Sequence, residues 1–167
     1  MGTSQETTAR RQRALHIAIA GGSVIFVMAL AGAVTTPNIA TWYAGLQKPW
    51  FNPPNWVFGP AWSVLYPVIA YALFRILQLP RATPGRGAAI AVWFVQLALN
   101  CCWSLAFFGL RSPLLGLFVV AGMWLSIAAT IRLFQPLDRI AAWALAPYLA
   151  WVSFAAALNF AVWRLNP

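Results

Sequence analysis

Amides and aromatic rings are the side chains in this sequence whose types and spacing could form a site. Gln96, Asn100, Trp103 and Phe107 follow one another four, three and four residues apart, so they share one face of a helix. An amide in an apolar span is costly to leave without a partner. It must meet another helix, water or a ligand. The spacing leaves two alternatives open, an interhelical hydrogen bond and a ligand pocket.

A second stripe lies near the carboxyl end of the chain. Trp151, Ala155, Leu158 and Asn159 recur at helical spacing and form one face that is small in its middle. A large ring beside an alanine leaves a slot for a ligand. Packing of the helix core explains the same stripe, so both interpretations stand.

The segment 48–66, KPWFNPPNWVFGPAWSVLY, combines prolines with aromatic residues. Proline and its preceding residue disfavour helix, which predicts a stiff lid over residues 48–56. Gly59 and Pro60 then open a helix that places Trp62 and Tyr66 one above the other. A pocket for a flat apolar ligand and an aromatic belt at the membrane interface both fit this pattern. The aromatic residues of the lid are Trp50, Phe51 and Trp56.

The sequence offers no conventional catalytic or metal-binding set. It has no Ser–His–Asp arrangement, no His/Cys cluster with metal spacing and no glycine-rich phosphate loop. The one histidine, His16, lies at the edge of an apolar run, which disfavours a haem ligand. The predicted spans carry no acidic residue, which argues against a proton-coupled carrier. We therefore predict no acid–base catalytic residue, no metal and no covalent cofactor.

Composition identifies the class of protein. Of 167 residues, 62% are hydrophobic and only 8% are charged, whereas a soluble domain has about 25% charged residues. The formal net charge of +9 comes from arginines and lysines that lie mostly singly at the edges of apolar runs. That distribution is typical of membrane topology signals rather than of a nucleic-acid-binding surface. The chain is therefore expected to be an integral membrane protein without a nucleic-acid partner.

The apolar runs predict an all-α bundle of five transmembrane helices. Each run meets the ~20 residues that a helix needs to cross the hydrocarbon core. We expect a disordered tail over 1–13, a membrane domain over 14–167 and an ordered loop over 35–56. The first run exceeds the ~7–15 residues of a signal-peptide core, which favours a retained helix over a cleaved signal. The five predicted spans are 14–34, 57–79, 88–110, 114–134 and 140–163.

Three motifs in this order resemble the TspO/MBR family, which comprises bacterial tryptophan-rich sensory proteins and the mitochondrial translocator protein. They are KPWFNPPNWVFGPAWSVLY, QLALNCCW followed by FFG, and PYLAWVSFAAALNFAVWR. The resemblance extends from the first helix to Arg164. It implies a multi-pass protein, usually dimeric, of a bacterial or the mitochondrial outer membrane. It also implies binding of porphyrins and, in mitochondrial members, of cholesterol and benzodiazepine-type drugs.

Several residues match functional positions of that family. Trp62 and Trp151 match two tryptophans connected with porphyrin breakdown in some bacterial members. The sterol motif of the mitochondrial protein falls on Leu158 to Arg164, with Phe160 where that motif has tyrosine. Leu115 stands where the mitochondrial protein has a pocket tryptophan. Pocket-lining positions of the family correspond to Asn100, Trp103, Ala155 and Leu158.

We therefore expect a membrane receptor or transporter, without enzymatic activity, that binds tetrapyrroles such as protoporphyrin or haem and has a sensory role. Sterol-like lipids are a second expected ligand class, and a homodimer is the expected assembly. The alternatives are a light- and oxygen-dependent porphyrin-degrading enzyme that uses Trp62 and Trp151, and a structural protein that modulates partners. The residues expected to bind the ligand are Trp62, Tyr66, Gln96, Asn100, Trp103, Trp151, Ala155, Leu158 and Asn159.

Overall fold

A computed structural model describes residues 2–166, which form helices joined by short connections and one longer loop, with no strand among them. Five stretches are long and apolar enough to cross a membrane, which confirms the predicted all-α bundle. The helices are α1 (Gly2–Ile39), α2 (Phe58–Leu77), α3 (Arg86–Ser104), α4 (Pro113–Phe134), α5 (Arg139–Ala144) and α6 (Ala146–Leu165). Shorter turns are η1 (Tyr43–Gly45), η2 (Asn55–Val57) and the π-helical η3 (Leu105–Gly109).

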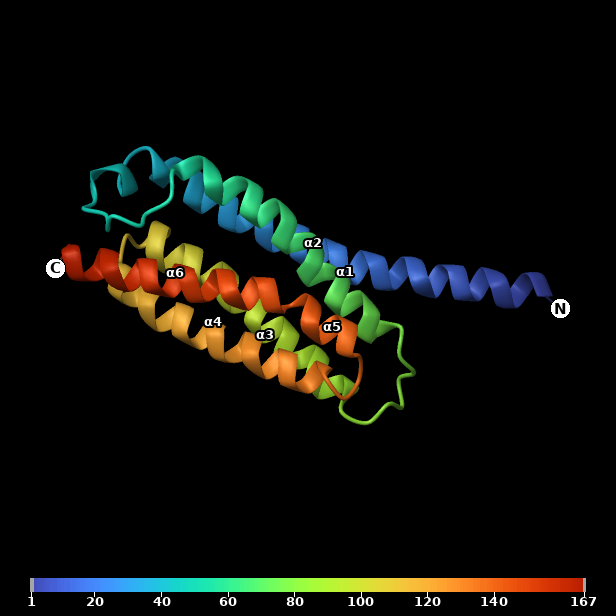
Figure 1. Cartoon of the computed structure of the whole chain (residues 1–167). Coiled ribbons are helices and arrows are strands. Elements are labelled where there is room, and N and C mark those ends of the chain that lie inside the picture. The colour runs from blue at the N-terminus through green and yellow to red at the C-terminus, as the bar shows by residue number, and fades with distance from the viewer. Residues whose placement is uncertain (1, 167) are drawn as a thin grey trace.

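The helices pack as an elongated bundle. α1 contacts α2 and α3, and α4 packs against both α3 and α6. The amino-terminal part of α1 projects beyond the other helices (Figure 1). The loop 40–54, which joins α1 to α2, and the carboxyl end of α6 lie together at the opposite end of the bundle (Figure 1). This loop therefore covers one end of the helices and contacts no part of the projecting segment.

The first helix is longer than its apolar run. α1 begins at Gly2 and continues to Ile39, where the sequence predicted a disordered tail over 1–13 and a loop from residue 35. Residues 2–13 contain no proline and include good helix formers, so the packed helix extends outward through them. Pro37 removes one backbone hydrogen bond in the last turn. The side chain of Asn38 donates in the same turn to a different carbonyl, that of Val34, 2.9 Å away.

Two other predicted spans are interrupted. The run 140–163 divides into α5 and α6 around Leu145, because Pro147 has no N–H to donate within the helix. The run 88–110 ends in the π-helical turn η3, where the N–H of Leu110 donates to the carbonyl of Leu105, 2.8 Å away. A π turn rotates the residues after it relative to a regular helix. As a result, Phe107 and Phe108 are both buried.

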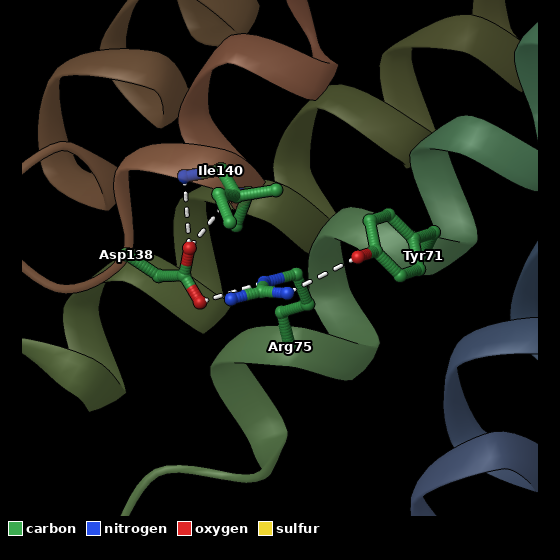
Figure 2. A network of polar contacts seen from close by, with 5 residues as sticks. Tyr71, Arg75, Asp138 and Ile140 are labelled. Carbon is green, nitrogen blue, oxygen red and sulfur yellow. Dashed lines mark hydrogen bonds and ion pairs between the residues drawn. The ribbon is translucent and has the colours of Figure 1, made fainter.

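An ion pair fastens α5 to α2 at the end of the bundle that carries the amino terminus. Figure 2 shows Asp138 between the first turn of α5 and Arg75, whose Nε lies 2.7 Å from Oδ2. Arg75 also donates to the hydroxyl of Tyr71 at 3.1 Å. The other carboxylate oxygen accepts from the N–H groups of Ile140 and Ala141, at 2.9 and 3.0 Å. Asp138 is thus both the N-cap of α5 and the acidic partner of α2.

The close contact of α4 with α3 and α6 depends on Gly116. A Cβ atom at this position would lie 2.8 Å from Oδ1 of Asn159 and 3.0 Å from the ring of Phe107. Asn159 itself accepts from Nε1 of Trp103 at 3.0 Å and donates to the carbonyl of Pro113 at 2.7 Å. The absence of a side chain on Gly116 therefore allows three helices to meet around one amide.

We predict that Asp138→Ala lowers the free energy of unfolding by about 1–2 kcal/mol at pH 7, because it removes the cap and the ion pair. Asp138→Asn retains an oxygen for the cap and should cost less. Burial opposes the charge of Asp138, but the N–H of Ala141 and the guanidinium of Arg75 outweigh it. They hold its pKa below the ordinary value of 3.8. The ion-pair contribution is therefore complete above that value and is lost as the pH falls through the folded-state pKa. Equal melting temperatures for all three proteins in detergent at pH 7 would contradict this prediction.

We also predict that Gly116→Ala destabilises the bundle by about 1–3 kcal/mol, because the added methyl group overpacks the contact around Asn159. The matched control is Gly122→Ala on the same helix, where the nearest atom to the added Cβ, on Leu99, is 3.9 Å away. Thermal unfolding in detergent measures both. Equal melting temperatures for the two variants would show that the contact at Gly116 relaxes freely.

Candidate functional site

A cavity of about 310 Å³ opens inside the bundle next to the loop 40–54. Its wall is formed by α1, α2, α3 with η3, and α6, and it includes Tyr43 and Asn55 from the two ends of the loop region. The volume falls at the lower end of the ~300–1,000 Å³ that small-molecule sites occupy. This cavity is the candidate ligand site.

The structure brings together most of the residues that the sequence proposed. Eight of the nine expected ligand-binding residues border the cavity: Trp62, Tyr66, Asn100, Trp103, Trp151, Ala155, Leu158 and Asn159. Gln96 is not among the residues of the wall. The lid residues Trp50, Phe51 and Trp56 do not border it either. Of the predicted lid 48–56, only Asn55 borders the cavity.

A chain of three buried polar side chains connects α2, α3 and α6 beside the cavity. The hydroxyl of Tyr66 donates to Oδ1 of Asn100 at 3.1 Å, and Nδ2 of Asn100 donates to the hydroxyl of Tyr148 at 3.2 Å. All three residues are at most 6% exposed. Both polar atoms of Asn100 already have protein partners, so its amide makes interhelical hydrogen bonds, the first of the two roles that the sequence left open. The amide of Asn159 also makes interhelical hydrogen bonds, with Trp103 and with the carbonyl of Pro113.

Aromatic rings from α2, α3 with η3, and α6 contribute to the cavity wall. Trp62 stacks on Tyr66 with ring centroids 4.9 Å apart and an interplanar angle of 29°. Trp103 stacks on Phe107 at 5.3 Å and 20°. Trp151 meets the edge of Phe58 at 6.0 Å. All six of these rings belong to residues of the wall, which is therefore rich in aromatic surface, and planar rings pack favourably on such surface.

Gln96 occupies a different environment from that predicted. It is 1% exposed, and neither atom of its amide has a hydrogen-bond partner among residues 2–166. It lies one helical turn before Asn100 on α3. Helical spacing therefore correctly predicted that Gln96 and Asn100 lie on one face of α3. Spacing gives no information on where along the helix the cavity ends.

Tyr43, which lies in the loop 40–54 but outside the predicted lid 48–56, borders the cavity, whereas the two tryptophans of the lid do not. Trp50 is 95% exposed and Trp56 is 74% exposed, so both rings point away from the bundle. Tyr43 is 4% exposed, and its hydroxyl donates to Oδ1 of Asn52 at 2.7 Å. Burial raises the pKa of Tyr43 to about 12, so this hydroxyl remains a neutral donor at physiological pH. Tyr43 was not among the predicted residues because it lies outside the proline-rich segment.

The sequence analysis also missed the part of the wall that α1 contributes. These residues are spaced by three and one residues in turn, which is the pattern of one helical face. That periodicity was available in the sequence, but nothing distinguished this face of α1 from a packing face. Phe108 was missed because the π turn, rather than regular helical spacing, brings it to the wall. The α1 residues of the wall are Met28, Ala31, Gly32, Thr35, Thr36 and Ile39.

The residues of the sterol motif separate in space. Leu158 borders the cavity and is buried. Phe160 is 50% exposed on the outside of α6, where its ring lies 5.8 Å from that of Trp163. Arg164 is also exposed. A sterol that contacted Phe160 and Arg164 would therefore lie against the lipid-facing surface of α6, outside the cavity.

The chemistry available to the cavity is that of rings, hydroxyls and amides. No carboxylate, amine or imidazole occurs among the described residues of its wall. Residues 2–166 contain no group of three or more His, Cys, Asp or Glu side chains that could hold a metal ion. The wall therefore offers apolar surface and neutral polar groups to a ligand, without charged side chains among its described residues.

Comparison with known proteins identifies the family. The TspO/MBR family model matches residues 19–164. A tryptophan-rich protein TspO of Archaeoglobus fulgidus is 41% identical over 147 residues, which cover 86% of this chain and 94% of the relative. A tryptophan-rich sensory protein of Cereibacter sphaeroides is 44% identical, with 83% and 84% covered. The human translocator protein is 40% identical, with 75% of each chain covered. Together with the five apolar spans, these matches show that the chain is a multi-pass integral membrane protein of the TspO/MBR family.

Proposed function

We propose that this protein is a membrane receptor that binds tetrapyrroles of the protoporphyrin or haem type in its internal cavity and has a sensory role. The observation that carries the proposal is the aromatic wall, to which Trp62 and Trp151 contribute from different helices. Relatives named tryptophan-rich sensory protein and translocator protein support a receptor or sensor function.

The cavity suits one face of a macrocycle. Flat rings on Trp62 and Trp103 offer stacking surfaces, and such ring pairs are worth about 0.5–1.5 kcal/mol each. The cavity is too small to enclose a whole tetrapyrrole. The propionate groups of the ligand would therefore extend out of the cavity toward the loop 40–54. Lys48 is the cation of that loop, and its Nζ lies 4.9 Å from the centre of the Tyr43 ring. We assign the propionates to this end of the site.

Sterol-like lipids and a second copy of the chain complete the proposal. Because Phe160 and Arg164 face outward, a sterol would bind on the surface of α6, separately from the tetrapyrrole. A homodimer needs a helix face with small residues. Ala98 and Cys102 provide one, since both are exposed on α3, four residues apart. Neither partner enters the cavity, so the tetrapyrrole site is complete within one chain.

We predict that Trp62→Ala and Trp151→Ala each weaken protoporphyrin binding about tenfold, because each removes a ring from the wall, a loss of about 1.4 kcal/mol. The measurement is a titration of the purified protein followed by tryptophan fluorescence quenching. Trp143→Ala is the matched control, since Trp143 is 60% exposed and does not border the cavity. If affinity is unchanged in both wall variants, the ligand does not bind in this cavity.

A second candidate function is light- and oxygen-dependent degradation of the bound porphyrin. Trp62 favours it, because its ring lies 4.9 Å from Tyr66 and 6.2 Å from Tyr148, which places three oxidisable rings together. Dioxygen would be the oxidant and the macrocycle would be oxidised, while the rings pass electrons transiently and are restored. The reaction requires no acid–base pair, in agreement with a wall that lacks ionisable groups of that kind.

Illumination of the aerobic complex distinguishes the two functions. Degradation predicts a distinct tetrapyrrole product that is lost in Trp62→Phe and Trp151→Phe while porphyrin binding persists. A receptor predicts bleaching at the rate of free porphyrin in detergent, with no effect of either substitution. Absorption spectra and mass spectrometry of the extracted pigment measure both outcomes.

A further inference from the structure

The last described residue of the chain makes an unusual contact with the loop 40–54. Oδ1 of Asn166 accepts from the backbone N–H of Gln47 at 3.0 Å, and Nδ2 of Asn166 donates to the carbonyl of Gln47 at 2.9 Å. The same Nδ2 donates to the carbonyl of Val162 at 2.8 Å. One amide side chain thus satisfies both backbone groups of Gln47, as a neighbouring strand would.

Asn166 is itself fixed to α6. It is the residue that ends this helix, and its backbone N–H donates to the carbonyl of Val162 at 3.1 Å. The same helix presents Trp151, Ala155 and Leu158 to the cavity. The amide of Asn166 therefore connects the loop directly to one wall of the candidate site.

The loop behaves as one unit around Tyr43. The hydroxyl of Tyr43 donates to Asn52, and the ammonium group of Lys48 lies over the ring of Tyr43. Lys48 also donates to the carbonyls of Ala44 and Leu46, both at 3.1 Å. The ring of Tyr43 packs against Phe107 and Phe108, at 6.2 and 5.8 Å between centroids. Gln47 directly precedes Lys48, so the contact with α6 lies next to the residue that covers the ring of Tyr43, and this ring borders the cavity.

Other attachments of this loop to distant helices are apolar. Trp42 and Tyr43 contact the rings of η3, and Phe51 meets the edge of Phe154 at 6.4 Å. Of the hydrogen bonds that residues 40–54 make within the described chain, only those with Asn166 reach a helix distant in sequence. The directional part of the attachment is therefore concentrated in one side chain.

We propose that Asn166 is a positioning residue that holds the loop 40–54 closed over the cavity and so sets the rate at which ligand enters and leaves. The part that concerns ligand exchange rests on the function proposed above. The attachment of the loop to α6 by Asn166 is independent of that function. The loop must open both for ligand to enter the free protein and for ligand to leave the bound protein. Loss of the contact between Asn166 and Gln47 therefore accelerates association and dissociation together and leaves the affinity nearly unchanged.

The test compares Asn166→Ala with the wild-type full-length protein in detergent. Hydrogen–deuterium exchange without ligand should become about tenfold faster in peptides that cover residues 40–54, which corresponds to about 1.4 kcal/mol. Exchange within α3 and α4 should change much less than exchange in the loop, and the melting temperature should fall by only a few degrees, as expected for the loss of one local contact. Protoporphyrin association and dissociation, followed by stopped-flow fluorescence, should both accelerate about tenfold at an equal dissociation constant.

The matched control is Thr41→Ala. The hydroxyl of Thr41 is exposed and donates at 2.9 Å to the carbonyl of Pro37 in the last turn of α1, so its loss leaves the attachment to α6 intact. Unchanged exchange of the loop in Asn166→Ala would overturn the proposal. Faster exchange of the loop with unaltered porphyrin kinetics would overturn the role in ligand exchange. If wild-type protein binds no protoporphyrin, the function proposed above fails, and hydrogen exchange alone decides whether Asn166 fastens the loop.

Discussion

The hydrogen-bonded chain of Tyr66, Asn100 and Tyr148 is the interaction on which the bundle depends most. The hydrocarbon core contains no water to satisfy these groups, so each must find its partner on another helix. Asn100 is suited to this position because its amide donates to one tyrosine and accepts from the other. These hydrogen bonds fix α2, α3 and α6 relative to one another beside the cavity. Removal of Asn100 would deprive the buried hydroxyls of both tyrosines of these hydrogen bonds.

The cavity persists because stiff rings surround it and polar contacts hold those rings. Trp103 cannot turn into the empty space without losing its hydrogen bond to Asn159, and Asn159 is held by Pro113. Side chains that are free to change rotamer would fill such a space, as protein interiors are close-packed. Small residues opposite the rings, such as Gly32 and Ala155, supply the remaining room. Polar contacts therefore maintain an apolar cavity.

The resemblance of three motifs indicated the family, and apolar length and helical spacing allowed the five spans and eight residues of the cavity wall to be predicted. Trp151 and Ala155 were found in this way. Tyr43 and Phe108 were not, since a loop fold and a π turn place them and neither has a period. Gln96 shares a face with Asn100 but lies outside the cavity wall, because spacing gives the direction of a side chain and not the depth of a cavity.

The position of the cavity within a membrane determines which forces can select a ligand. An apolar molecule gains about 25 cal/mol per Å² when it leaves water, but it gains this in the surrounding lipid as well. Burial alone therefore cannot draw a macrocycle from the bilayer into the bundle. Stacking on Trp62 and Trp103, and polar groups near Tyr43, must provide the difference. A planar ring with polar edges meets that requirement, whereas a flexible acyl chain does not, so the aromatic wall is a means of discriminating against lipid.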